Sequence, residues 1–170
     1  EKVASLCGRY YAMDRNQNWQ LTKAAYDLMT AGVGTSAPDP LPVIEATFAK
    51  GLTEEYLPPL RVQADGHIKE NDAVIFWNFR EDSMRQIGEA FLKPDFSAFP
   101  RTPFQNVAVI TMTPYARSIP SLPAFLPDTV QKPLGKVLSE QGLNQLRVAE
   151  TYKYAHVTYF FNGGEERTFK

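Results

Sequence analysis

Residues 73–80 read Ala73-Val74-Ile75-Phe76-Trp77-Asn78-Phe79-Arg80, the most hydrophobic run of the chain up to its final arginine. A run this continuously apolar and aromatic predicts a β-strand over 73–79 that is buried on both faces. The residues that follow, 82–92, predict a helix with three apolar residues on one face, Met84, Ile87 and Phe91. A buried strand that leads into an amphipathic helix is typical of α/β folds.

The same alternation of strands and helices continues on both sides of this stretch. Apolar runs predict further strands at 3–7, 60–62, 107–112 and 146–149. Helical spacing and cap residues predict helices from Asn16 to Gly32 or Gly34, and over 42–50, 130–141 and 152–162. We therefore expect an α/β protein whose mixed sheet carries helices on its faces. The proline-rich passage 114–127 is the expected domain boundary, because few contacts should cross it.

The composition limits the classes of function. The chain has 170 residues, 44% of them hydrophobic and 22% charged, with a formal net charge of −1. A near-neutral chain has no general attraction for nucleic acid or anionic lipid, so any affinity for phosphate must come from locally placed arginines. No apolar run approaches the roughly 18 residues of a membrane-spanning helix. Cys7 is the single cysteine; we expect it to be buried and to fit a reducing compartment such as the cytoplasm.

Arginines follow two of the predicted strands. Arg9 and Arg15 lie directly beyond the apolar run 3–7, and Arg80 ends the strand at 73–79. Ligand sites of open α/β sheets lie beyond the ends of strands, and guanidinium groups bind carboxylate and phosphate oxygens in pairs. The three arginines therefore predict one site for a small, doubly anionic ligand. The alternative is an ordinary ion-pair role, with Glu81 or Asp82 as the partner of Arg80.

Five blocks of sequence carry a resemblance to a known family. In order they are Gly8-Arg9-Tyr10-Tyr11-Ala12-Met13-Asp14-Arg15, Val74-Ile75-Phe76-Trp77-Asn78-Phe79-Arg80, Thr111-Met112-Thr113, Ala149-Glu150-Thr151-Tyr152-Lys153-Tyr154-Ala155-His156-Val157-Thr158 and Phe160-Phe161-Asn162-Gly163-Gly164. With these blocks, in this order, the chain resembles the cofactor-independent (2,3-bisphosphoglycerate-independent) phosphoglycerate mutases. The blocks extend over nearly the whole chain.

The resemblance implies part of a two-domain isomerase of glycolysis and gluconeogenesis. Residues 1–127 would be the later part of its inserted transferase domain, and residues 128–170 the beginning of the returning alkaline-phosphatase-like metal domain. Such enzymes interconvert 3-phosphoglycerate and 2-phosphoglycerate through a phosphoserine, with two manganese ions. The serine and metal-ligand motifs do not occur in this sequence. We therefore expect a fragment that is inactive alone and binds no manganese through its own residues; the full-length enzyme is expected to be a monomer.

The resemblance also implies roles for particular residues. It assigns Arg9, Arg15 and Arg80 to substrate binding, and Lys153 to catalysis beside the transferred phosphoryl group. Ser83 stands where the family usually has a second arginine, so substrate recognition is expected to differ there. Arg85, two helical residues later, should point to the opposite face and not replace that arginine. Two further residues are expected to contact the binding residues and not the substrate. Asp14 would orient the arginines, and His156 lies within one of the family blocks.

Other readings of the sequence remain open. A stand-alone, non-catalytic module that binds small phosphorylated carboxylic acids would also use the three arginines, although it would not need Lys153. The abrupt start, Glu1-Lys2-Val3, favours a piece of a longer protein instead. The two histidines, His67 and His156, lie in unrelated contexts and do not predict a metal site. Three aromatic residues near the arginines are expected to be packing residues, namely Tyr10, Tyr11 and Trp77.

Overall fold

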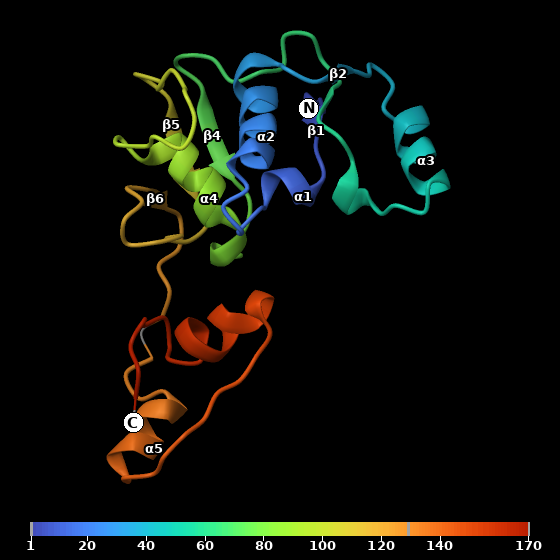
Figure 1. Cartoon of the computed structure of the whole chain (residues 1–170). Coiled ribbons are helices and arrows are strands. Elements are labelled where there is room, and N and C mark those ends of the chain that lie inside the picture. Colours follow the sequence, from blue (N-terminus) through green and yellow to red (C-terminus); the bar gives the residue numbers. More distant parts are fainter. Residues whose placement is uncertain (1, 129, 170) are drawn as a thin grey trace. The chain divides into compact units, whose positions relative to one another are not determined.

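The structure is a computed structural model that describes residues 2–128 and 130–169 (Figure 1). The chain divides into two compact units, Glu1–Leu126 and Pro127–Lys170. Helices alternate with short strands in the first unit, which confirms the predicted α/β class. Among the described residues, no helix is both long enough and apolar enough to cross a membrane.

The first unit contains a small mixed sheet. Its strands are β1 (Ser5–Leu6), β2 (Thr35–Ser36) and β3 (Leu60–Arg61). The central strand, β3, pairs antiparallel with β1 and parallel with β2. Leu60 is fully buried there and packs with Ala37 and Leu57. The predicted strands at 3–7 and 60–62 are thus confirmed, in shorter form, and β1 leads directly to the arginine stretch.

A second sheet is entirely parallel. Its strands are β4 (Ala73–Phe76), β5 (Ala108–Thr111) and β6 (Leu122–Pro123), in the order β4-β5-β6. The last of these lies inside the proline-rich passage, which therefore contributes to the sheet instead of only linking domains. Helix α4 (Glu81–Leu92) follows β4 and packs on the sheet. The core between them is formed by buried residues that include Phe76, Met84, Ile87, Ala90, Val109 and Tyr115.

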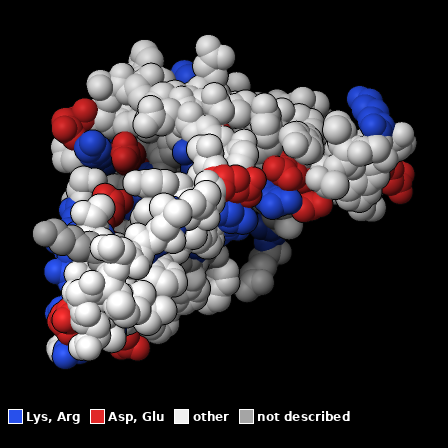
Figure 2. Space-filling view, turned by 60° about the horizontal axis from the view of Figure 1, so that its bottom comes forward, with Lys and Arg blue, Asp and Glu red and all other residues white. Residues whose placement is uncertain are grey.

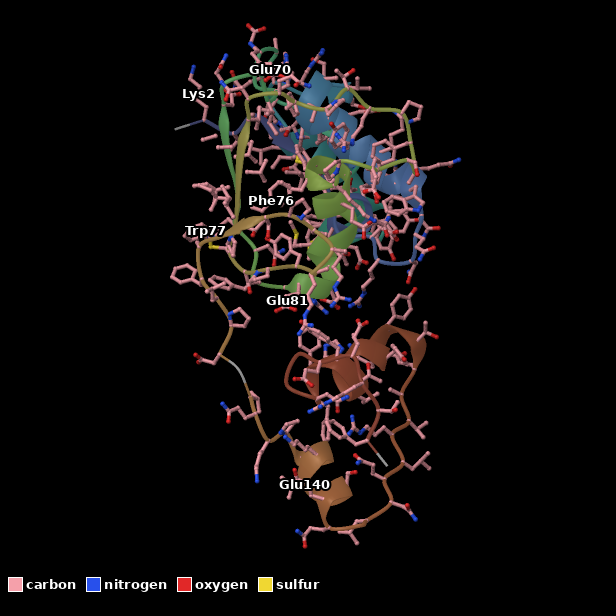
Figure 3. The ribbon with its side chains drawn as sticks, turned by 90° about the vertical axis from the view of Figure 1, so that its left-hand side faces the viewer. Lys2, Glu70, Phe76, Trp77, Glu81 and Glu140 are labelled. Atoms are coloured by element: carbon pink, nitrogen blue, oxygen red, sulfur yellow. The ribbon has the colours of Figure 1, made fainter. Side chains whose placement is uncertain are left out.

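The prediction that β4 is buried on both faces is wrong. Phe76 is 7% exposed, whereas Ile75 is 55% and Trp77 82% exposed. Figure 3 shows Trp77 pointing away from the helices, on the side of the sheet opposite to α4. Because α4 covers only one face, side chains that alternate along the strand are buried on that face and exposed on the other. Trp77 is therefore not the packing residue that the sequence predicted.

The remaining helices of the first unit are α1 (Arg9–Ala12), α2 (Trp19–Ala31), α3 (Leu41–Ala49) and the 3₁₀ turn η1 (Glu54–Tyr56). Among them, α2 and α3 agree closely with the sequence prediction, whereas α1 lies where a loop was expected. Gly32 ends α2 with a φ of 63°, and Gly51 follows α3 with a φ of 73°, values that glycine adopts without strain. Cys7 is half-buried, and desolvation raises the pKa of its thiol to about 12.

The second unit differs most from the sequence prediction. It contains α5 (Leu134–Glu140), the 3₁₀ turn η2 (Thr151–Lys153) and the π-helix η3 (His156–Phe160). The predicted helix 152–162 is broken into the last two elements. The predicted strand 146–149 is absent, and Leu146 and Val148 are 89% and 80% exposed. An apolar run becomes a strand only when a partner strand supplies backbone hydrogen bonds, and none of the described strands pairs with residues 146–149.

Candidate anion-binding site

One buried carboxylate holds two of the three predicted arginines together. Asp82 lies in the first turn of α4 and is 8% exposed. Its Oδ2 accepts a short hydrogen bond from Arg15 Nη1, and its Oδ1 lies 3.3 Å from Arg80 Nε. Arg15, from the loop before α2, and Arg80, from the segment between β4 and α4, are thereby brought to the amino-terminal end of α4.

The electrostatics of Asp82 follow from this pairing. Burial by itself would raise the pKa of its carboxyl group, because it penalises the charged form. The positive charges of Arg15 and Arg80, with hydrogen bonds from Arg15 and the backbone of Ser83, outweigh burial and lower the pKa. Asp82 is therefore a fixed negative charge at neutral pH, and with its two arginines it forms a cluster of net positive charge.

The geometry leaves this cluster able to receive an anion. A guanidinium group has five N–H donors, and Arg80 uses Nε for Asp82 while 46% of its side chain remains exposed. The amino-terminal end of α4 adds a partial positive charge at the same place. The Arg80 backbone N–H is itself held by Asn78 Oδ1 at 2.8 Å, which fixes where the guanidinium leaves the chain. A carboxylate or phosphate group fits this arrangement.

The loop that carries Arg15 is tied to helix α4. Asp14 is buried and accepts hydrogen bonds from the backbone N–H groups of Asn16 and Asn18, at 3.3 and 2.9 Å. Gln86, one turn beyond Asp82, donates to Asp14 Oδ2 at 2.8 Å. The sequence predicted that Asp14 orients the arginines. In the structure its bonds go to the loop backbone and to α4, and Asp82 is the acidic partner of Arg15.

Ser83 and Arg85 lie where the sequence departs from the family pattern. Ser83 is 3% exposed, and its hydroxyl donates to Asp82 Oδ1 at 3.3 Å, so it supports the carboxylate and not an anion directly. Arg85 Nε donates to Tyr115 O at 2.9 Å. That bond directs Arg85 toward the loop after β5, in keeping with the predicted change of face.

Arg9 has different partners. Its guanidinium donates to Glu55 Oε2 at 2.9 Å and lies 3.9 Å from Glu54 Oε1, both in η1, and its side chain is 52% exposed. The structure therefore brings Arg15 and Arg80 together on Asp82 and pairs Arg9 with η1. Figure 2 shows basic and acidic side chains next to one another on the surface, without a large region of one sign.

Lys153 and His156 belong to the second unit. Lys153 is an exposed residue at the end of η2, with its backbone N–H bonded to Glu150 O at 2.9 Å. His156 is exposed at the start of η3, and its ring centroid lies 5.6 Å from that of Phe160. Within the part of the chain that the structure describes, no group of three or more His, Cys, Asp or Glu residues could hold a metal ion.

Sequence reasoning missed two contributors to this site. Asp82 was considered only as an alternative ion-pair partner of Arg80, a pair that the structure contains, and not as the partner of Arg15. Gln86 was not considered at all. Their spacing could have indicated that they act together, because residues four apart lie on one face of a helix. Pairing either residue with the loop 14–18 needs the tertiary structure.

The comparisons with known proteins agree on one family. Residues 1–117 match the family described as BPG-independent PGAM N-terminus. The chain is 50% identical to the 2,3-bisphosphoglycerate-independent phosphoglycerate mutase of Synechococcus sp. (strain JA-2-3B'a(2-13)), over 98% of this chain and 31% of that protein. Identity to the Thermomicrobium roseum enzyme of the same name is 48%, over 98% of this chain and 33% of that protein.

A solved structure shows the same likeness in three dimensions. The phosphoglycerate mutase of Leishmania mexicana, solved at low cobalt concentration, superposes with a TM-score of 0.79 and 25% identity, over 99% of this chain and 33% of that one. The fold is thus the α/β fold of a portion of this class of enzyme. The chain belongs to the family of 2,3-bisphosphoglycerate-independent phosphoglycerate mutases, and it spans about a third of the length of these relatives.

Proposed function

We propose that this chain is the substrate-binding portion of a phosphoglycerate mutase that interconverts 3-phosphoglycerate and 2-phosphoglycerate through a phosphoserine. Membership of the family supports the reaction. The observation that carries the assignment to this chain is the pairing of Arg15 and Arg80 on buried Asp82. A rigid pair of guanidinium groups suits a substrate that has a carboxylate and a phosphate on one small molecule.

The arginines bind and orient in this account. Arg15 and Arg80 hold substrate oxygens while glycerate turns between the two phosphoryl positions, so their contribution is positioning and charge stabilisation. Arg9 joins them by exchanging its exposed contacts with Glu54 and Glu55 for the substrate. Lys153 places a cation beside the transferred phosphoryl group, where charge redistributes in the transition state. Asp14, Ser83 and His156 would help to position these binding and catalytic residues without contacting the substrate themselves.

The rest of the reaction belongs to the longer protein. We assign residues 1–127 to the later part of its transferase domain and residues 128–170 to the beginning of its metal domain. The serine nucleophile and the ligands of two manganese ions would lie outside this chain, which would then be inactive alone. The full-length enzyme would be a cytoplasmic monomer, with phosphoglycerates, and neither nucleic acid nor membrane, as its partners.

Steady-state kinetics on the full-length protein test this function. Arg15→Ala should raise KM for 3-phosphoglycerate about tenfold to a hundredfold, because a charge-assisted hydrogen bond contributes about 1.5–3 kcal/mol. Arg117→Ala, which removes an exposed arginine of the same unit, is the matched control and should leave KM unchanged. Binding of 3-phosphoglycerate without any turnover would favour the non-catalytic module instead. Equal KM values for both variants and the parent would contradict the assigned site.

A further inference from the structure

The side chain of Gln86 makes three hydrogen bonds from inside the protein. It is 6% exposed on α4. Its Nε2 donates to Asp14 Oδ2 at 2.8 Å and to Thr22 Oγ1 at 2.5 Å, and its Oε1 accepts from the backbone N–H of Gln17 at 3.0 Å. One amide thus connects α4 to the loop before α2 and to α2 itself.

That loop needs an external constraint. Gln17 has a φ of 61°, a left-handed conformation that is strained for a residue with a side chain. Contacts within the loop supply part of this constraint, since Asn18 Nδ2 donates to Asp14 Oδ1 at 3.2 Å. Gln86 supplies the contact to a rigid helix, and it holds the loop at the strained residue Gln17 and at Asp14, three residues earlier.

The same helix face holds the side chain of Arg15. Asp82 and Gln86 are four residues apart, so they lie on one face of α4. Asp82 binds the guanidinium of Arg15, and Gln86 binds residues 14 and 17 of the loop from which that guanidinium extends. Fixing the backbone as well as the tip of a long side chain leaves it few conformations, which is the condition for a preorganised anion site.

We propose that Gln86 is a positioning residue for Arg15. It holds the loop 14–18 against α4 so that the guanidinium meets both Asp82 and an anionic ligand at once. The effect on the loop stands on the hydrogen bonds alone, whereas the effect on phosphoglycerate rests on the proposed function.

The test compares Gln86→Met with Gln63→Met in the full-length protein. Methionine keeps nearly the volume of glutamine and removes all three hydrogen bonds, and Gln63 is an exposed glutamine of the same unit. Hydrogen exchange followed by mass spectrometry should show at least about tenfold faster exchange over 14–18 in Gln86→Met, since one such hydrogen bond contributes about 1–1.5 kcal/mol. Gln63→Met should exchange like the parent.

A double-mutant cycle with Arg15→Ala then separates positioning from general stability. If Gln86 acts through Arg15, Gln86→Met raises KM about tenfold in the parent and leaves it unchanged in an Arg15→Ala background. Effects on KM that multiply would overturn the proposal, because Gln86 would then act independently of Arg15. Unchanged exchange over 14–18 would overturn it whatever the kinetics. A parent without mutase activity would refute the proposed function, and the exchange result would still decide the role of Gln86 in the loop.

Discussion

Asp82 combines burial with two cationic neighbours, and each property has a consequence at the scale of single residues. Burial removes most of the water that would hydrate the charged carboxylate. The guanidinium groups of Arg15 and Arg80 replace that hydration with hydrogen bonds and opposite charge. In return it keeps two positive charges close together that would otherwise repel each other. An arginine pair of this kind can receive an anionic ligand without first being assembled.

Replacing Asp82 by Asn should lower the free energy of unfolding of the chain by about 2–3 kcal/mol at pH 7, because two charge-assisted hydrogen bonds are lost. The lowered pKa of Asp82 gives the sign of the pH dependence. Its stabilising effect is complete above the unfolded-state pKa of about 3.9 and disappears as the pH falls through the folded-state pKa. Urea unfolding at pH 7 and at a series of values below pH 4 measures this difference.

Asp95→Asn is the matched control, since Asp95 is exposed in the loop after α4. It should change stability by less than about 0.5 kcal/mol at either pH. A difference between Asp82→Asn and the parent that stays constant down to pH 2 would contradict the ionic role of Asp82.

At the scale of elements, α4 is central because it packs on the parallel sheet through one face and organises the site at its first turns. Its hydrophobic face and its limits were predictable, since the helical spacing of Met84 and Ile87 is clear in the sequence. The one-sided burial of β4 was not predictable, because Ile75 and Trp77 on its open face are as apolar as Val74 and Phe76 on the covered face.

Other errors at this scale have equally local causes. The run 146–149 has the composition of a strand, but composition does not show whether a partner strand exists. The link from Arg15 to Asp82 joins residues 67 positions apart, and spacing along the chain carries no information about such a contact. The strand-exit position of Arg80 was predictable because strand, arginine and helix are consecutive.

The exposure of Trp77 can be measured directly in this chain. Trp77 is 82% exposed, whereas Trp19 packs against the core beside Phe96. Acrylamide should therefore quench the emission of Trp77 strongly and that of Trp19 several-fold less. The parent, which contains both, should be quenched more than Trp77→Phe, which contains only Trp19. Equal quenching of the parent and of Trp77→Phe would show that the open face of β4 is covered in solution.

At the scale of the whole molecule, the proposed function makes the chain one part of a longer enzyme. It covers about a third of its relatives, and its two units carry different parts of the proposed chemistry. The first unit holds the arginine pair, and the second carries Lys153 on η2. Binding and phosphoryl transfer should accordingly respond to different substitutions.

Lys153→Ala in the full-length enzyme should lower kcat about a hundredfold and change KM little, because a cation beside a transferring phosphoryl group acts mainly in the transition state. Lys132→Ala, which removes an exposed lysine of the same unit, should leave both constants unchanged. Steady-state kinetics, with folding checked by circular dichroism, measures both. A Lys153→Ala enzyme with normal turnover would remove this residue from the site.

The central claim is that Arg15 and Arg80, held by Asp82, bind the phosphoglycerate. A crystal structure of the full-length protein with 3-phosphoglycerate tests it most directly. We predict carboxylate or phosphate oxygens within about 3.2 Å of guanidinium nitrogens of both arginines, with the ion pairs to Asp82 retained. A substrate bound elsewhere, with Arg15 and Arg80 in contact with Asp82 alone, would contradict the account.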